Sequence, residues 1–198
     1  MTLQDLAKYY QIQMVDCIYQ ITTQNNCYNI ISFPRNFYHL TGIQRTKEFK
    51  NVNDVSQFYF DCVNGTYTNN LNQYSYLSKS SRNIVLMKSV CFPVIQQTIL
   101  QCDKIYHIQE QGGDCGKSIS TLIQFGKKQK YSTIIFKSDK QLNDDYYIPA
   151  SIQLDQDLSK SIASKAYNIE TVETVKCYSR NDSNIQQIIC NSNKQEKH

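Results

Sequence analysis

The sequence predicts an α+β fold in which N-terminal helices pack on a four-stranded antiparallel β-meander. Before residue 102, apolar residues recur every three or four positions, which is the spacing of one helical face. After it, four short segments are rich in β-branched and aromatic residues, which favour strands. Helices followed by strands are typical of proteins whose helices cover one face of an antiparallel sheet. A chain of 198 residues is long enough to form such a core in one domain.

The first helix is expected after Thr2, whose hydroxyl can cap a helix N-terminus, and before the polar turn at residues 24–26. Its apolar positions share one helical face and are Leu3, Leu6, Ala7, Tyr10, Met14, Cys17, Ile18 and Ile21. A β-favouring run over residues 27–33 follows. It stops at Pro34, which suits the first turn of the next helix.

Two more helices are expected before residue 102. One covers about residues 54–63 and is closed near Gly65, because glycine readily adopts the left-handed conformation of a helix end. The other begins near residue 80 and continues to residue 102. Pro93 is expected to kink or split it, since proline cannot donate the backbone hydrogen bond of a helix interior.

The second half of the chain predicts strands joined by short connections, which favours an antiparallel meander. The four expected strands cover residues 105–110, 119–125, 131–137 and 146–154. Beyond residue 155 the chain has one expected helix, near residues 158–167, and few large apolar residues. We therefore assign residues 1–155 to a single α+β domain and residues 156–198 to a polar C-terminal extension that is partly helical or frayed.

Charge and cysteine usage limit the class of protein. The net charge is +4, and the excess lies in residues 35–50 and 127–140, which suits an anionic partner. Eight cysteines without a secretory signal predict reduced thiols and a cytoplasmic location. The longest apolar run, at residues 90–95, is too short to cross a membrane. The sequence has no C-x-x-C motif and no pair of histidines four residues apart, so no metal site is expected.

A glycine-rich segment at residues 112–118 has some features of a phosphate-binding loop. The first glycine of that motif would fall at position 111, which is glutamine, and the segment leads into an expected strand rather than a helix. We therefore interpret it as a β-turn. Lys117 could activate the nearby thiol of Cys115, but no base accompanies that thiol.

His39 is the first candidate for chemistry, because histidine exchanges protons near neutral pH. The alternative is a helix end at which His39 caps a carbonyl while Phe37, Leu40 and Ile43 pack inward.

A second candidate cluster lies on the expected last strand. Its alternation puts Tyr147, Pro149 and Ser151 on one face and apolar residues on the other. This face is either a surface of the sheet whose tyrosines cover a helix, or part of a metal-free phosphodiesterase site. In such a site a base takes the 2′-proton of the ribose, cations stabilise the charge on phosphorus, and hydroxyls position the phosphate.

Four segments resemble a known family. Residues 37–43, 58–66, 82–84 and 146–151 are similar to the fourth subgroup of phage-borne nucleases, a group related to barnase, EndoU, colicins E5 and D, and RelE. The resemblance implies a barnase/RelE-like fold that binds RNA on an open sheet face without metal. It also implies that His39 is an acid or base and that Tyr147 and Ser151 contact phosphate or sugar.

Two hypotheses follow. The first is a metal-independent endoribonuclease, toxin-like or carried by a mobile element, which needs no cofactor and has RNA and a cognate inhibitor protein as partners. Its expected catalytic residues are His39, Tyr147 and Ser151, and its expected RNA-binding residues are Arg35, Arg45, Lys47, Arg82 and Lys137. The second is a non-catalytic RNA- or protein-binding module of a phage or mobile element; a purely structural role is a weaker option. The enzyme requires an accessible imidazole near a cation and a hydroxyl, whereas the module does not.

Overall fold

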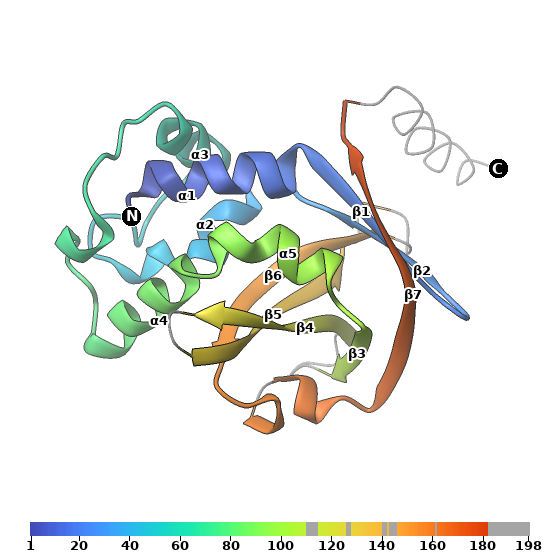
Figure 1. Cartoon of the computed structure of the whole chain (residues 1–198). Helices are drawn as coiled ribbons and strands as arrows, with labels where there is room; N and C mark the ends of the chain where they lie inside the picture. The colour runs from blue at the N-terminus through green and yellow to red at the C-terminus, as the bar shows by residue number, and fades with distance from the viewer. Residues whose placement is uncertain (110–114, 126–127, 140–141, 143–145, 161, 182–198) are drawn as a thin grey trace.

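The protein folds as a closed seven-stranded β-barrel with helices gathered on one side (Figure 1). This computed structural model describes residues 1–109, 115–125, 128–139, 142, 146–160 and 162–181. Around the barrel the strands follow the order β1-β2-β6-β5-β4-β3-β7. The strands are β1 (Cys17–Thr23), β2 (Cys27–Ile31), β3 (Lys104–Gln109), β4 (Cys115–Phe125), β5 (Lys128–Ser138), β6 (Tyr146–Asp155) and β7 (Asn168–Ser179).

The helices lie mainly before and between the strands. They are α1 (Leu3–Tyr10) with its π-helical continuation η1 (Gln11–Val15), α2 (Asn36–Thr41), α3 (Val55–Val63), α4 (Lys79–Ser89) and α5 (Ile95–Leu100). Short 3-10 turns are η2 (Ile43–Arg45), η3 (Leu71–Gln73), η4 (Phe92–Val94), η5 (Leu158–Lys160) and η6 (Ile162–Lys165). The expected helix near residues 54–63 is confirmed as α3, and the expected break at Pro93 is confirmed as η4 between α4 and α5.

The expected fold class, helices on a four-stranded antiparallel meander, is wrong. Strands β3, β4, β5 and β6 do pair antiparallel in chain order. However, the sheet continues beyond them, because β2 pairs parallel with β6 and β7 pairs with both β3 and β1. These pairings join segments far apart in the chain, which hydrophobic periodicity does not report. The result is a mixed barrel without the open sheet face that the nuclease resemblance implies.

The first expected helix also extended too far. The helical segment ends at Val15, and after Asp16 the seven residues Cys17–Thr23 form β1, which pairs with β2 in a hairpin. Residues such as Ile18 and Ile21 fit the spacing of a helical face as well as a strand, so the pattern was ambiguous. The β-branched run Ile21–Thr23 and the hairpin turn favour the strand.

The segment after residue 155, expected to be a polar extension, includes a strand of the barrel. Strand β7 pairs with β1 from Cys17↔Ser179 to Thr23↔Val172 and with β3 from Lys104↔Thr171 to His107↔Asn168. Most of its side chains are exposed, so its composition is polar although its backbone is fully part of the sheet. The expected frayed end at residues 182–198 lies outside the described residues.

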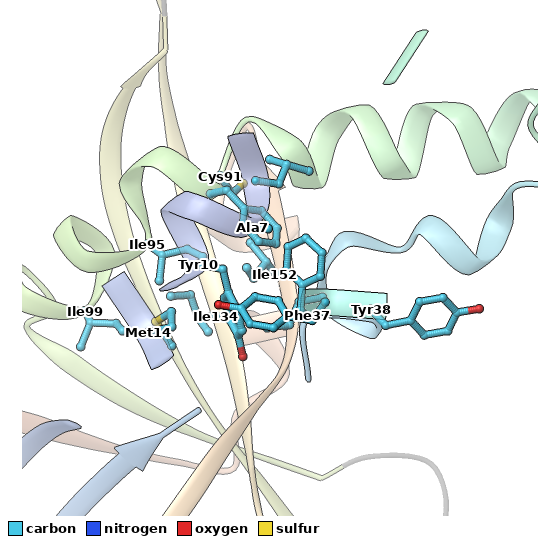
Figure 2. Close-up of a cluster of buried hydrophobic side chains, with 14 of the residues drawn as sticks. Ala7, Tyr10, Met14, Phe37, Tyr38, Cys91, Ile95, Ile99, Ile134 and Ile152 are labelled. Atoms are coloured by element: carbon cyan, nitrogen blue, oxygen red, sulfur yellow. The ribbon is translucent and has the colours of Figure 1, made fainter. Parts of the chain in front are cut away.

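One hydrophobic core joins the helices to the inner face of the barrel. In it Tyr10 of α1 packs against Phe37 of α2, with ring centroids 5.6 Å apart, and Phe37 packs against Phe92 at 6.0 Å. Figure 2 shows Ile134 and Ile152, from β5 and β6, next to these rings. The helices therefore close one side of the barrel with aromatic side chains.

The helical stretch Lys79–Leu100 is long and apolar enough to cross a membrane by length and composition. It is interrupted at η4, and 39% of its apolar window is buried in the protein. This is weak evidence for a span, because a core helix of a soluble protein has the same length and composition.

Candidate nucleic-acid interface

Helix α2 presents His39 to solvent while its neighbours are buried. The helix ends at Gly42, whose φ of 73° is in the left-handed region and whose N–H donates to the carbonyl of His39 at 3.2 Å. Phe37, Leu40 and Ile43 are fully buried, as the helix-end interpretation expected. The imidazole of His39 itself caps nothing in the described structure; it is exposed, with its ring 5.3 Å from that of Tyr38.

Two basic side chains next to α2 are oriented by a short antiparallel pairing. Thr46 bridges to Tyr76, the N–H of Lys47 donates to the carbonyl of Ser75 at 2.8 Å, and the N–H of Leu77 donates to the carbonyl of Arg45 at 2.9 Å. Thr46 is buried. Because successive side chains of an extended segment point to opposite sides, Arg45 and Lys47 both face solvent.

Helix α4 adds three more cations. It begins at Ser78, whose side chain accepts from the N–H of Ser81, and its first two turns expose Lys79 and Arg82. Arg82 donates to the side-chain oxygen of Asn72 at 3.4 Å. Near the other end, Lys88 is half-buried.

Lys88 connects α4 to α2. Its Nζ donates to the carbonyl of His39 at 3.4 Å, which places a positive charge at the C-terminus of α2. Burial, and then the nearby charge of Arg45, lower the pKa of Lys88 to about 8. Lys88, Arg45 and His39 are therefore close neighbours in the fold.

We define the basic surface as the side chains of His39, Arg45, Lys47, Lys79, Arg82 and Lys88. The carboxylate of Glu48, adjacent to Lys47, is engaged by the backbone N–H of Ser75 at 2.9 Å. The side chains of the basic surface come from α2, from residues 45–47 and from α4; Figure 1 shows α2 and α4 on the side of the molecule away from β7. A polyanion is the ligand that such a surface attracts most strongly.

Two other expected RNA-binding residues are engaged elsewhere. Arg35 forms an ion pair with Asp139 at 2.7 Å, and its guanidinium lies 4.9 Å from the centre of the Phe33 ring. Lys137 lies on β5 opposite Ile148.

The structure does not bring Tyr147 and Ser151 to one face. A register shift in the pairing of β5 with β6 lies between Ile135 and Phe136. As a result Tyr147 lines a cavity inside the barrel, and Ile152, five residues later, is also on the core side. Ser151 precedes Ile152 and points the other way. The uniform alternation expected for this strand is therefore wrong.

The cavity that Tyr147 lines is too small for a substrate. It lies between the strands of the barrel, with a volume of about 10 Å³, which is room for one water. Its other lining residues are Ile21, Tyr28, Ile30, Ile105, Lys117, Ile119 and Phe136. Tyr147, which was expected to position a phosphate, is thus a half-buried residue that lines the interior of the barrel.

Next to this cavity lies a buried polar network that the sequence did not predict. Lys117 of β4 donates to Nδ1 of His107 at 2.7 Å, and Nε2 of His107 lies 2.5 Å from the carboxylate of Glu170 on β7. Both side chains of the His107–Glu170 pair are only 10% exposed. Glu170 also accepts from Tyr28 at 2.6 Å and from Thr23 at 2.5 Å. A signal was present, because His107 shares one face of an expected strand with the apolar Ile105, but the partners of His107 are distant in sequence.

Among the described residues, no group of three or more His, Cys, Asp or Glu side chains is arranged to hold a metal ion. Comparison with protein-family models, curated proteins and solved structures gives no match to this chain.

Proposed function

We propose that this protein binds single-stranded RNA through the basic surface on α2, η2 and α4. The observation that carries the proposal is the contact of Lys88 with the end of α2 close to Arg45, with exposed Lys47 two residues after Arg45 and exposed Arg82 on the same helix as Lys88. Each cation that neutralises a phosphate releases a condensed counterion, which makes such a surface favour polyanions. We place this binding in the cytoplasm, where the free thiols of the described cysteines stay reduced.

The side chains of the basic surface suit an unpaired strand. An exposed imidazole such as that of His39, and the planar guanidinium groups of Arg45 and Arg82, can stack on unpaired bases. Stacking of this kind contributes about 1–3 kcal/mol per base with an aromatic partner and tolerates any sequence. RNA loops and single strands offer such bases, whereas a duplex does not.

A second candidate function is metal-independent RNA cleavage at the same surface, as the nuclease resemblance implies. One observation favours it: His39 is exposed, and the ammonium of Lys88, which is close to Arg45, donates to the backbone carbonyl of the same residue. His39 would act as the base, and the two cations would stabilise the charge on phosphorus. A toxin-like role on a mobile element, with an inhibitor protein that covers the basic surface, belongs to this candidate.

Neutralising three cations is expected to weaken RNA binding. In the triple variant R45Q/R82Q/K88Q, the affinity for a fluorescein-labelled single-stranded RNA should fall at least about tenfold, because three phosphate contacts are lost. The slope of log affinity against log salt concentration should become shallower by about 2. Fluorescence anisotropy at several salt concentrations measures both quantities.

Lys176→Gln is the control for this experiment, because Lys176 is an exposed lysine on β7, away from the basic surface. Its affinity should match that of the wild type. Equal binding by the wild type and the triple variant would contradict the proposal. If the wild type cleaves the RNA in EDTA and His39→Ala does not, the second candidate replaces the first.

RNA affinity is also expected to fall as the pH rises from about 7 to 9. Lys88, with a pKa of about 8, is charged at the lower pH and mostly neutral at the higher one. The loss of one partly exposed charge should weaken binding about threefold. In Lys88→Met this decrease should be absent, whereas Lys79→Met should retain it; anisotropy titrations of the three proteins at both pH values make the comparison.

A further inference from the structure

The hydrogen-bond partners of His107 determine which of its ring nitrogens carries the hydrogen. A lysine ammonium has only N–H donors, so Nδ1 of His107 must be the acceptor of the 2.7 Å bond from Lys117. The other ring nitrogen, Nε2, then carries the hydrogen and donates to Glu170 at 2.5 Å. His107 is therefore neutral in this arrangement, between one cation and one anion.

A second proton on the ring is incompatible with this geometry. It would bind at Nδ1, and its N–H would then point at an ammonium group whose nitrogen is 2.7 Å away. Two donors at that distance repel each other, and two positive charges would face each other in a buried site. Lys117 must move away when His107 is protonated, while the bond between Nε2 and Glu170 is retained.

The other groups around His107 do not relieve this conflict. Tyr28 of β2 already donates to Glu170, and the ring of Tyr167, which precedes β7, is 6.0 Å from the imidazole. Burial acts to raise the pKa of Glu170, but the hydrogen bonds from Thr23, Tyr28 and Asn26 outweigh it and bring the value to about 2. The carboxylate therefore stays charged throughout the range in which histidine titrates.

We infer that this end of the barrel is a pH-sensitive latch, in which proton binding at Nδ1 of His107 breaks the Lys117 bond and loosens the pairing of β3 with β4. His107 and Lys117 are directly opposite each other on these strands. Their side-chain bond therefore stabilises the same pairing that its loss weakens. Burial and the charge of Lys117 lower the pKa of His107, so the latch opens at a lower pH than the titration of an unperturbed histidine would set.

Hydrogen exchange tests the latch on the whole protein. Between about pH 7.5 and pH 5, after correction for intrinsic exchange rates, the protection of the backbone amides of residues 106–108 and 116–118 should fall about tenfold. Amides of the β1–β2 hairpin, at residues 18–21, should keep their protection and serve as the internal reference.

His107→Gln is the decisive variant, because a glutamine amide offers one acceptor and one donor and binds no proton in this range. It should keep the same protection at both pH values. His39→Gln removes the exposed histidine of α2, and the amide protection of residues 106–108 and 116–118 should fall in it as it does in the wild type. Constant protection in the wild type, or an undiminished fall in His107→Gln, would overturn the inference.

A measurement on the wild type removes any dependence on the folding of His107→Gln. The chain has only three histidines, so the ring signals of His107 can be followed by NMR during a pH titration. The side-chain signals of Lys117 should shift with the same midpoint as the ring of His107. Lys117 signals that stay constant while His107 becomes protonated would refute the latch.

Discussion

Replacing Phe37 by alanine is expected to lower the free energy of unfolding by about 3–5 kcal/mol. Phe37 is fully buried, and its ring contacts those of Tyr10, Phe58, Tyr59 and Phe92. Alanine would leave a cavity where α1, α2 and α3 meet the barrel, and rings held on several elements cannot collapse into it. Urea unfolding followed by circular dichroism measures the change.

Phe60→Ala is the matched control, because Phe60 lies on α3 but is 46% exposed. Its effect should stay within about 0.5 kcal/mol, as for other surface substitutions. A loss of similar size in both variants would show that Phe37 is not part of a tightly packed core.

Glu170→Ala is expected to cost about 3–5 kcal/mol at neutral pH, because it leaves buried donors without their acceptor. The buried donors come from β1, β2 and β3, namely Thr23, Tyr28 and His107, and the exposed amide of Asn26 in the β1–β2 turn is a further donor. Glu173→Ala removes an exposed carboxylate from the same strand and should change stability by less than about 0.5 kcal/mol. Equal effects of the two substitutions in urea unfolding would contradict the role of Glu170.

The free energy of unfolding at acidic pH gives a second test of the role of Glu170. The pKa of Glu170 is lowered in the folded protein, to about 2 from its ordinary 4.5, so its contribution to stability is complete above pH 4.5. That contribution is lost progressively as the pH falls from 4.5 toward 2. Between these pH values Glu170→Ala should lose less stability than the wild type does.

Local structure was predictable where a side chain acts on its own neighbours. Thr2 forms the expected N-terminal cap of α1, since its hydroxyl accepts from the N–H of Asp5. Gly65 has the expected positive φ after α3, and Pro93 separates α4 from α5. Each of these features depends on residues a few positions apart, so the sequence displays it directly.

The closure of the barrel was not predictable in this way. It depends on the parallel pairing of Ile30 with Tyr147 and on β7, whose exposed polar side chains resemble those of a loop. For the same reason, helix α2 could be placed around His39, but its neighbour Lys88 comes from a helix almost fifty residues later and was missed. The network of His107, Lys117 and Glu170 likewise exists only because three strands meet.

The pairing of β1 with β7 has a consequence for synthesis. Cys17 and Ser179 lie side by side in the finished barrel, yet the ribosome adds Ser179 long after Cys17. Until the last strand emerges from the exit tunnel, β1 has one unpaired edge, and such edges are sites of aggregation in a nascent chain. Closure of the barrel is therefore expected to be slow, and it cannot begin before β7 has left the ribosome.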